Sequence, residues 1–267
     1  MRESFSLAAS RLRRRLLGGA LTGDARSRLR PFRTGSLIAA LALLALTLPA
    51  PAVAQAYQCT VPKRIEAPRA PRPDGPVRRT PVGSYILAAS WSPEYCKFAK
   101  SRSPMQCSRR NGYFGFVLHG LWPQAARGPA PQWCPTRRVP SVRTIRRNLC
   151  MTPSPQLMAR EWAKHGSCMV RKPETYFKVS SILWRSINWP DADRLSRNKE
   201  LTAGDLREAF VLANPGWEPE YVGIDANPNG WLRGLRLCYG KDFMPRNCPR
   251  WGLGPVNNTP LKIWRGL

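Results

Sequence analysis

Histidine is nearly absent from this chain of 267 residues, which contains only His119 and His165. The two lie far apart in the sequence, and no two cysteines have the Cys-x-x-Cys spacing, so the usual ligand patterns of a zinc site are missing. We therefore expect no metal and no cofactor. Each histidine instead lies in a short segment dense in reactive side chains, which makes the pair the most informative feature of the composition.

Acidic residues are also scarce, with 16 Asp and Glu against 43 Lys and Arg, a net charge of +27. Residues 1–56 hold 9 Arg and 2 acidic residues, so the remainder keeps 34 basic and 14 acidic residues, or +20. Such an excess indicates a polyanionic partner such as nucleic acid, anionic lipid or anionic polysaccharide. Adaptation to an envelope or to an arginine-rich proteome is the alternative explanation.

Long apolar runs are missing as well. The apolar run over residues 37–48 has 12 residues, whereas a membrane span needs about 20. Arginines precede it, and two Ala-x-Ala cleavage patterns follow at 52–54 and 54–56, as in a secretory signal. We predict that residues 1–56 are a signal peptide with a long basic n-region, that the protein is secreted or periplasmic, and that no stable membrane span is left after processing. An uncleaved anchor is the alternative.

Eight cysteines all follow the predicted cleavage site. An even number of cysteines after an export signal is typical of disulfides in an oxidising compartment, here four of them. Zinc ligation is the competing interpretation, which the spacing disfavours.

The rest of the chain divides into a Pro- and Arg-rich segment, residues 57–82, and one domain over 83–267. A hydrophobic content of 43% with 10 Trp argues for a globular fold. Apolar runs predict strands over 84–90, 113–118, 235–239 and 261–264. Capping signals and periodicity predict helices over 155–165, 173–188 and from a capping box at 202–205 to about 213. This mixture favours an α+β fold with a single domain.

The first reactive segment is Val-Leu-His119-Gly-Leu-Trp122-Pro. The pattern predicts that His119 ends an apolar strand at a sheet edge, where its ring can reach solvent and substrate. A lone histidine in such a position is more often structural, although functional residues favour the ends of elements.

The second segment is Arg160-Glu161-Trp-Ala-Lys164-His165-Gly-Ser-Cys168. On a helix, Glu161 shares a face with Lys164 three residues on and His165 four residues on. The alternative is an ordinary surface ion pair between Glu161 and Lys164. A solvated charged face needs neither an imidazole nor a neighbouring cysteine anchor, which favours a functional site.

These side chains suit phosphodiester transfer in RNA. A base has to remove the proton of the ribose 2′-hydroxyl and an acid has to protonate the departing 5′-oxygen. Imidazole can do both because its ordinary pKa is about 6.5. Lys164 and Arg160 can stabilise negative charge on the phosphorane, and Glu161 can hold Lys164 or an imidazole in place. DNA lacks the 2′-hydroxyl and should not be cleaved.

Both segments resemble the two active-site motifs of the ribonuclease T2 family. Ser84–Cys96, which ends in Trp91-Ser-Pro-Glu-Tyr-Cys96, also resembles that family's first strand and the turn after it. The resemblance covers roughly residues 83 to 250. It implies an α+β fold with a central antiparallel sheet flanked by helices. It also implies cleavage through a 2′,3′-cyclic phosphate to 3′-phosphate ends.

By position, the resemblance makes His165 the base and His119 the acid, with Glu161 and Lys164 stabilising the transition state. Trp122 matches an aromatic residue that stacks on a base, while a core tryptophan is an equally good interpretation. The resemblance implies disulfides Cys134–Cys168, Cys238–Cys248 and Cys96–Cys107, and Cys59–Cys150 then follows by elimination.

The sequence also departs from the family. Many members have a third histidine where this chain has Arg160, which could bind phosphate but cannot share in proton transfer. Ser90 stands where some plant members have a glutamine that contacts a base. Residues 57–82 have no counterpart in the family.

The leading hypothesis is a metal-independent, monomeric endoribonuclease that cleaves single-stranded RNA. A catalytically silent protein that binds RNA or another polyanion on the same fold is the alternative. A metal-dependent nuclease is a third interpretation, which loss of activity in EDTA would support.

Overall fold

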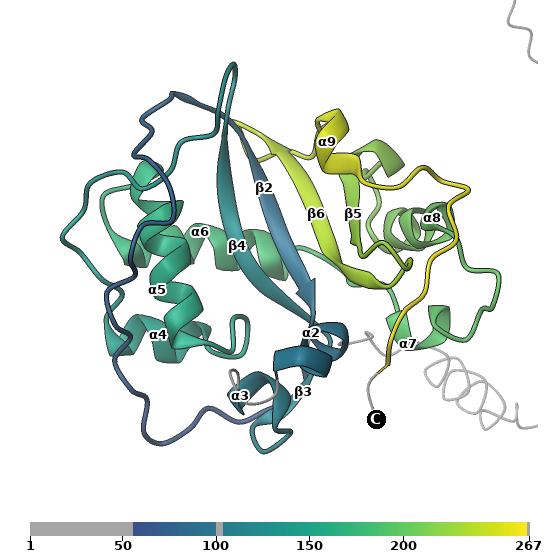
Figure 1. The fold of residues 1–267 in the computed structure, drawn as a ribbon, viewed down its shortest axis with the longest axis horizontal. Helices are drawn as coiled ribbons and strands as arrows, with labels where there is room; N and C mark the ends of the chain where they lie inside the picture. Colours follow the sequence, from purple (N-terminus) through teal and green to yellow (C-terminus); the bar gives the residue numbers. More distant parts are fainter. Residues whose placement is uncertain (1–55, 100–103, 266–267) are drawn as a thin grey trace, which may run out of the picture. The chain divides into compact units, whose positions relative to one another are not determined.

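The computed structural model describes residues 56–99 and 104–265, so the predicted signal peptide lies outside the described residues except for Ala56. At its centre is a four-stranded antiparallel sheet in the order β4–β2–β6–β5 (Figure 1). The strands are β2 (Val82–Trp91), β4 (Phe116–Ala125), β5 (Val222–Ala226) and β6 (Leu232–Gly240). The strands predicted over 84–90 and 235–239 are confirmed inside β2 and β6, and β5 was not predicted.

Two strand predictions need correction. The strand predicted over 113–118 is divided at Gly115, because β3 (Gly112–Phe114) pairs with β1 (Ala56–Cys59) in a separate two-stranded sheet while β4 joins the main sheet. The strand predicted over 261–264 is wrong. Among the described residues, that segment makes one isolated bridge, between Lys262 and Trp231, and no continuous ladder to a neighbour.

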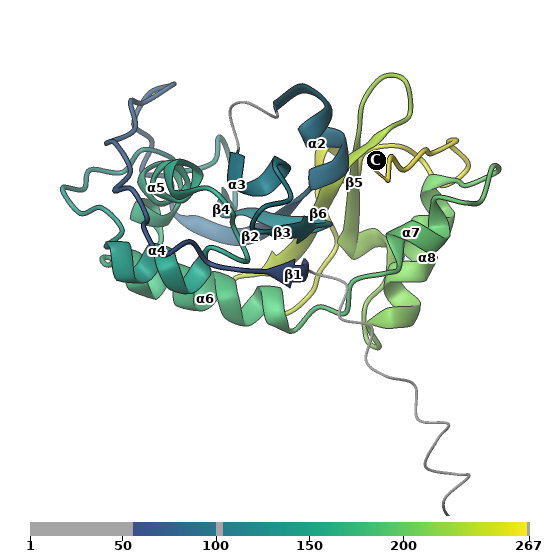
Figure 2. The ribbon, with the colours of Figure 1, turned by 90° about the horizontal axis from the view of Figure 1, so that it is seen from below.

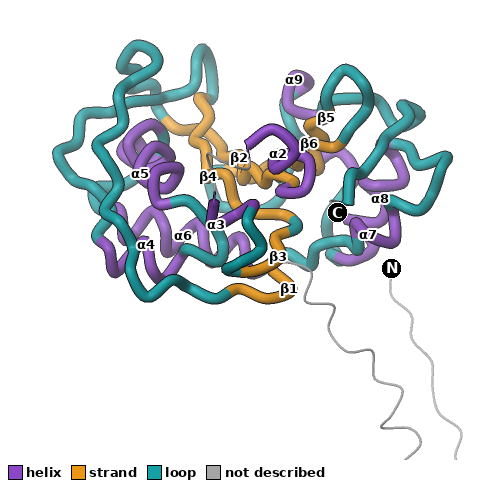
Figure 3. Tube along the Cα trace, turned by 60° about the horizontal axis from the view of Figure 1, so that its bottom comes forward, coloured by secondary structure: helices purple, strands orange, loops and turns teal. Residues whose placement is uncertain are grey.

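Helices flank the sheet (Figure 3). On the side of β4 are α4 (Val142–Asn148), α5 (Pro155–Lys164) and α6 (Pro173–Arg185), and on the side of β5 are α7 (Ala192–Leu195), α8 (Ala203–Ala213) and α9 (Arg250–Leu253). Two short helices, α2 (Ser92–Ala99) and α3 (Pro104–Cys107), follow β2. Single 3₁₀ turns span Gly166–Cys168 and Pro219–Tyr221. The fold is therefore α+β, with an antiparallel sheet and helices, in a single domain.

Helix ends follow local hydrogen bonding. The side chain of Ser154 accepts a hydrogen bond from the backbone of Leu157 and so caps α5, with Pro155 in the first turn. The predicted capping box is present at α8, where Thr202 and Asp205 cap each other's backbone. The predicted starts of α5, α6 and α8 are thereby confirmed, while α6 ends at Arg185, three residues before the predicted end.

The main core lies between the sheet and the flanking helices. From β2 and β4, Leu87 and Leu118 pack into the same buried cluster as Met158 and Trp162 of α5 and Tyr176 of α6. Burying large apolar side chains in this way is the dominant stabilising contribution to such a fold. The core holds α5 firmly against β4, the two elements that carry the predicted site.

Four disulfides reinforce the fold, at the pairs that the family resemblance and elimination gave. They join Cys59–Cys150, Cys96–Cys107, Cys134–Cys168 and Cys238–Cys248. Each closes a loop whose entropy in the unfolded chain is thereby reduced.

The N-terminal segment, residues 57–82, runs past α4 and α5, on the side of the sheet where β4 lies (Figure 2). The guanidinium of Arg146 on α4 donates to the carbonyls of Pro62 and Lys63. Arg69 and Gln156 exchange hydrogen bonds at the start of α5. The segment is therefore held against α4 and α5 before β2 begins. Within the described residues, no helix combines the length and hydropathy needed to cross a bilayer.

Candidate active site

His119 lies at a bulge in the edge strand of the main sheet. In the pairing of β2 with β4, Ala88 is opposite Gly120 and Ala89 is opposite Leu118, so His119 is the extra residue. A bulge turns a side chain away from the regular alternation of the strand and is common beside active sites. The predicted sheet edge is confirmed, but the predicted strand end is wrong, because β4 continues to Ala125.

Glu161 of α5 is at the centre of the site. Its carboxylate is 3.5 Å from Nε2 of His119 and 3.9 Å from Nε2 of His165, on different oxygens. The indole N–H of Trp122 donates to the same carboxylate at 2.7 Å. The two histidines, 46 positions apart in the sequence, thus contact one carboxylate.

This carboxylate is almost completely buried, with 3% of Glu161 exposed. Burial raises its pKa, but the hydrogen bond with His119, the charges of both imidazoles and the Trp122 N–H outweigh burial and bring the pKa below its ordinary value. Glu161 is therefore an anion at neutral pH and can orient and stabilise a protonated imidazole.

Gly120 makes room for this arrangement. A Cβ atom at this position would run into the carboxylate of Glu161 and come within 2.9 Å of Nε1 of Trp122. Only glycine lets the strand backbone come so close to the carboxylate.

The position of His165 is fixed by the end of α5. His165 is the C-terminal cap of this helix, and its backbone N–H donates to the carbonyl of Glu161 at 3.0 Å. Gly166 follows where a Cβ would clash with Trp162 and Tyr176, and the disulfide of Cys168 anchors the next turn to the loop after β4.

Burial lowers the pKa of His165 to about 4, against the opposing charge of Glu161, and the charge of Lys164 lowers it further. Its Nδ1 is buried without a hydrogen-bond partner among the described residues. Both features favour the neutral imidazole, since a protonated ring needs a partner for each N–H. His165 is suited to accept a proton at neutral pH.

The other ring nitrogen of His119 is held by Ser90, whose hydroxyl is 3.1 Å from Nδ1. Ser90, for which the sequence suggested no more than a possible base contact, thus contacts the histidine. The hydrogen bond and Glu161 together fix the ring between β2 and α5.

Trp122 lies close to both imidazoles. Its ring centroid is 5.4 Å from that of His119 and 5.6 Å from that of His165. With its N–H bound to Glu161, Trp122 orients the carboxylate, a contact that neither stacking on a base nor a purely apolar role would require.

Lys164 and Arg160 both contact Asp74, an acidic residue that the sequence analysis did not single out. Nζ of Lys164 is 3.1 Å from Asp74, and the guanidinium of Arg160 pairs with the same carboxylate. The indole N–H of Trp133 donates to Asp74 at 2.9 Å. Hydrogen bonding to Lys164, assisted by Trp133 and Arg160, holds the pKa of Asp74 far below its ordinary range. The ordinary ion pair considered for Lys164 with Glu161 is thus replaced by one with Asp74.

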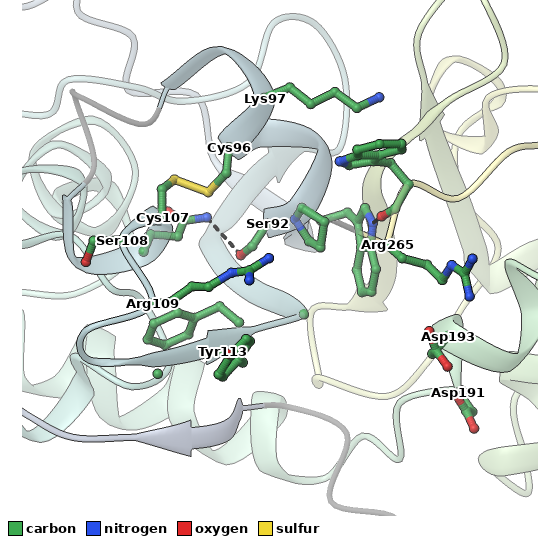
Figure 4. A pocket seen from close by; sticks show the side chains of 17 residues that line it. Ser92, Cys96, Lys97, Cys107, Ser108, Arg109, Tyr113, Asp191, Asp193 and Arg265 are labelled. Atoms are coloured by element: carbon green, nitrogen blue, oxygen red, sulfur yellow. Dashed lines mark hydrogen bonds between the residues drawn. A yellow bond between two sulfur atoms is a disulfide. The ribbon is translucent and has the colours of Figure 1, made fainter. Parts of the chain in front are cut away.

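A separate cavity of about 860 Å³ opens beside α2, α3 and β3 (Figure 4). Cations and aromatic rings line it together with two aspartates; they include Trp91, Lys97, Arg109, Tyr113, Asp191, Asp193, Trp264 and Arg265. The cavity lining does not include His119, Glu161, Lys164 or His165. Within the described chain, no three His, Cys, Asp or Glu side chains gather in a way that could hold a metal ion.

Comparisons with known proteins show the family to which the chain belongs. The model of the Ribonuclease T2 family matches residues 82–198, which include both motifs. The chain is 31% identical over 184 residues to a probable ribonuclease of Haemophilus influenzae, covering 64% of this chain and 62% of that protein, slightly less than two thirds of its length. It is 37% identical over 164 residues to a ribonuclease of Aeromonas hydrophila, covering 59% of this chain and 72% of that protein.

Solved structures show the same fold. Trichomaglin, described as an S-like ribonuclease, superposes with a TM-score of 0.56 at 22% identity, covering 69% of this chain and 98% of its own. RNase NT, solved in complex with 5′-AMP, gives the same TM-score and coverage at 18% identity. From the matched family model, the extent of the Aeromonas alignment and the shared fold, the chain belongs to the ribonuclease T2 family.

Proposed function

We propose that the protein is an endoribonuclease that cleaves single-stranded RNA without a metal ion, through a 2′,3′-cyclic phosphate to 3′-phosphate ends. The observation that carries this proposal is the contact of both imidazoles with the one buried carboxylate of Glu161. Two imidazoles beside one anion suit a reaction in which one gives a proton while the other takes one.

In the first step, neutral His165 takes the proton of the ribose 2′-hydroxyl. The 2′-oxygen then forms a bond to phosphorus while the bond from phosphorus to the 5′-oxygen breaks. His119, protonated and stabilised by Glu161, gives a proton to the departing 5′-oxygen. The substrate supplies its own nucleophile, which is why the reaction requires 2′-hydroxyls and spares DNA.

In the second step, water opens the cyclic phosphate with the two proton transfers reversed, leaving a 3′-phosphate. Lys164 and Arg160 supply positive charge for the non-bridging oxygens, which carry increased negative charge in the transition state. Trp122 keeps Glu161 oriented, and stacking of a base on its ring stays a prediction.

The decisive experiment is digestion of RNA and of matched DNA in EDTA across pH, with analysis of the end groups. We expect cyclic-phosphate and 3′-phosphate ends from RNA and no cleavage of DNA. Loss of activity in EDTA would favour a metal-dependent nuclease.

A His119→Ala variant separates an enzyme from a silent binding protein. It should lose turnover by roughly 10²-fold or more, as expected on removal of a general acid, while its RNA affinity stays close to that of the wild type. Wild-type protein that binds RNA but never produces these ends would be a polyanion-binding protein on the same fold.

The four disulfides support a location in an oxidising compartment, outside the cell or in the periplasm. Fractionation of cells that express the full chain checks this, and a fully reduced cytosolic protein would contradict it.

A further inference from the structure

We infer that Arg160, Lys164 and the indole N–H of Trp133 form a binding subsite for a phosphate of the RNA chain, and that Asp74 occupies this subsite as a built-in competitor. This inference rests on the proposed function, because it specifies what the two cations beside the catalytic histidines bind. It gives residues 57–82, which apart from Val82 lie outside the stretch matched by the family model, a role in substrate affinity.

The donors around Asp74 are those that recognise a phosphodiester. An ammonium lies 3.1 Å from each carboxylate oxygen, a guanidinium pairs with one oxygen, and an indole N–H donates to the other at 2.9 Å. A phosphodiester resembles a carboxylate here, because it carries one negative charge shared by two non-bridging oxygens. Arginine and lysine bind both groups through the same charge-assisted hydrogen bonds.

The subsite adjoins the proposed reaction centre. Arg160 and Lys164 lie on α5 on either side of Glu161, and His165 follows Lys164 directly. Lys164 is three residues after Glu161, which corresponds to about 4.5 Å along the helix axis. A phosphate held by these cations would therefore lie on the RNA chain at or next to the bond that is cleaved.

Asp74 can be displaced from these donors. Its side chain is 41% exposed, and those of Arg160 and Lys164 are 38% and 22% exposed. Exposed ion pairs add little net stability, because water competes for both partners. An RNA phosphate that brings further contacts along the chain can replace this carboxylate without unfolding anything.

The segment around Asp74 is anchored independently of this ion pair. Arg78 and Gln132 exchange backbone hydrogen bonds, and the side chain of Gln132 donates to the carbonyl of Pro76. Asp74 is consequently presented to the cations at a high local concentration. Replacing its charge should leave the path of the segment unchanged.

The test is an Asp74→Asn variant of the full chain, with Glu66→Gln as the matched control. Glu66 is exposed in the same segment and takes part in none of the ion pairs of the described residues, so the control removes an equal charge away from the subsite. Affinity is measured by fluorescence anisotropy with a single-stranded DNA oligonucleotide at fixed ionic strength. Because DNA has no 2′-hydroxyl to be cleaved, the measurement does not depend on whether the protein cleaves RNA.

We expect Asp74→Asn to bind about threefold to tenfold more tightly than Glu66→Gln, the range that one or two exposed ion pairs correspond to. The dependence of log K on log salt should steepen by about 0.7, the value for one further phosphate contact on a single strand. In a Lys164→Gln background, most of the gain should be lost, because the two residues act on each other.

Equal affinities of the two variants, or weaker binding by Asp74→Asn, would overturn the inference. So would a loss of kcat with unchanged KM on RNA, which would make Asp74 a positioning residue for Lys164. Asp74→Ala serves as a second variant, and matching circular dichroism spectra confirm that each variant is folded.

Discussion

Changing pH alone perturbs the proposed base. Burial lowers the pKa of His165 to about 4 despite the charge of Glu161, whereas an ordinary histidine has a pKa of about 6.5. At pH 5 an imidazole with a pKa of about 4 is about 90% neutral, and an ordinary one only about 3%. If neutral His165 is the base, kcat/KM at pH 5 should be about 30-fold higher than it would be with a base whose pKa is about 6.5, because the neutral fraction is about 30 times larger.

The assay is the initial rate of cleavage of a short fluorogenic RNA between pH 3.5 and 8 at constant ionic strength. The acidic limb of kcat/KM reports the pKa of the base in the free enzyme. We expect this limb near pH 4, with nearly full activity at pH 5. An acidic limb at pH 6 or above, in protein that is still folded, would refute the assignment of His165 as the buried neutral base.

Stability has to be followed over the same range, because the shift in pKa also affects folding. The unfolded chain protonates His165 below about pH 6.5, whereas the folded chain does so only near pH 4. The unfolded state therefore binds the proton first, and the free energy of unfolding falls as pH decreases from 6.5 to 4. The loss amounts to roughly 3 kcal/mol. Urea denaturation at pH 7 and pH 4.5 measures it.

Three further variants test other parts of the site and the fold. Glu161→Gln keeps the shape but removes the charge that stabilises protonated imidazole, so kcat should fall about 10²- to 10³-fold in RNA cleavage assays; near-normal kcat would contradict the central role of this carboxylate. Gly120→Ala forces a methyl group against Glu161 and Trp122, so urea denaturation should show a loss of about 1–3 kcal/mol, and a neutral result would mean that the strand can move away. Replacing Cys59 and Cys150 together by serine opens a disulfide between residues 91 positions apart and should cost about 2–5 kcal/mol in guanidinium denaturation. An unchanged midpoint would show that β1 and the N-terminal segment dock without it.

Local features of the fold were predictable because their physical causes are local. The caps of α5 and α8 join residues three apart, so Ser154 and Thr202 mark these helix starts in the sequence itself. The prediction of a strand over 261–264 was wrong because strand formation depends on a partner that is distant in the sequence. A short apolar run looks the same whether or not another strand is free to pair with it, and the described neighbours offer only single bridges.

The bulge at His119 could not be predicted either. It depends on the register between β2 and β4, which is set by the packing of both strands and leaves no pattern in β4 alone. The same holds for Ser90, whose contact with His119 follows from that register.

The sequence by itself determined which reactive groups the protein has: two imidazoles, a carboxylate and a lysine, placed in two short motifs whose internal spacing is set by one strand and one helix. Only the tertiary structure decided that both imidazoles contact the carboxylate of Glu161, and that Asp74 contacts Arg160 and Lys164 across 86 and 90 positions of sequence. Contacts over such separations depend on the fold of the whole chain, which the core and the disulfides hold in place. They produce no local sequence pattern, because the residues that meet are far apart in the sequence.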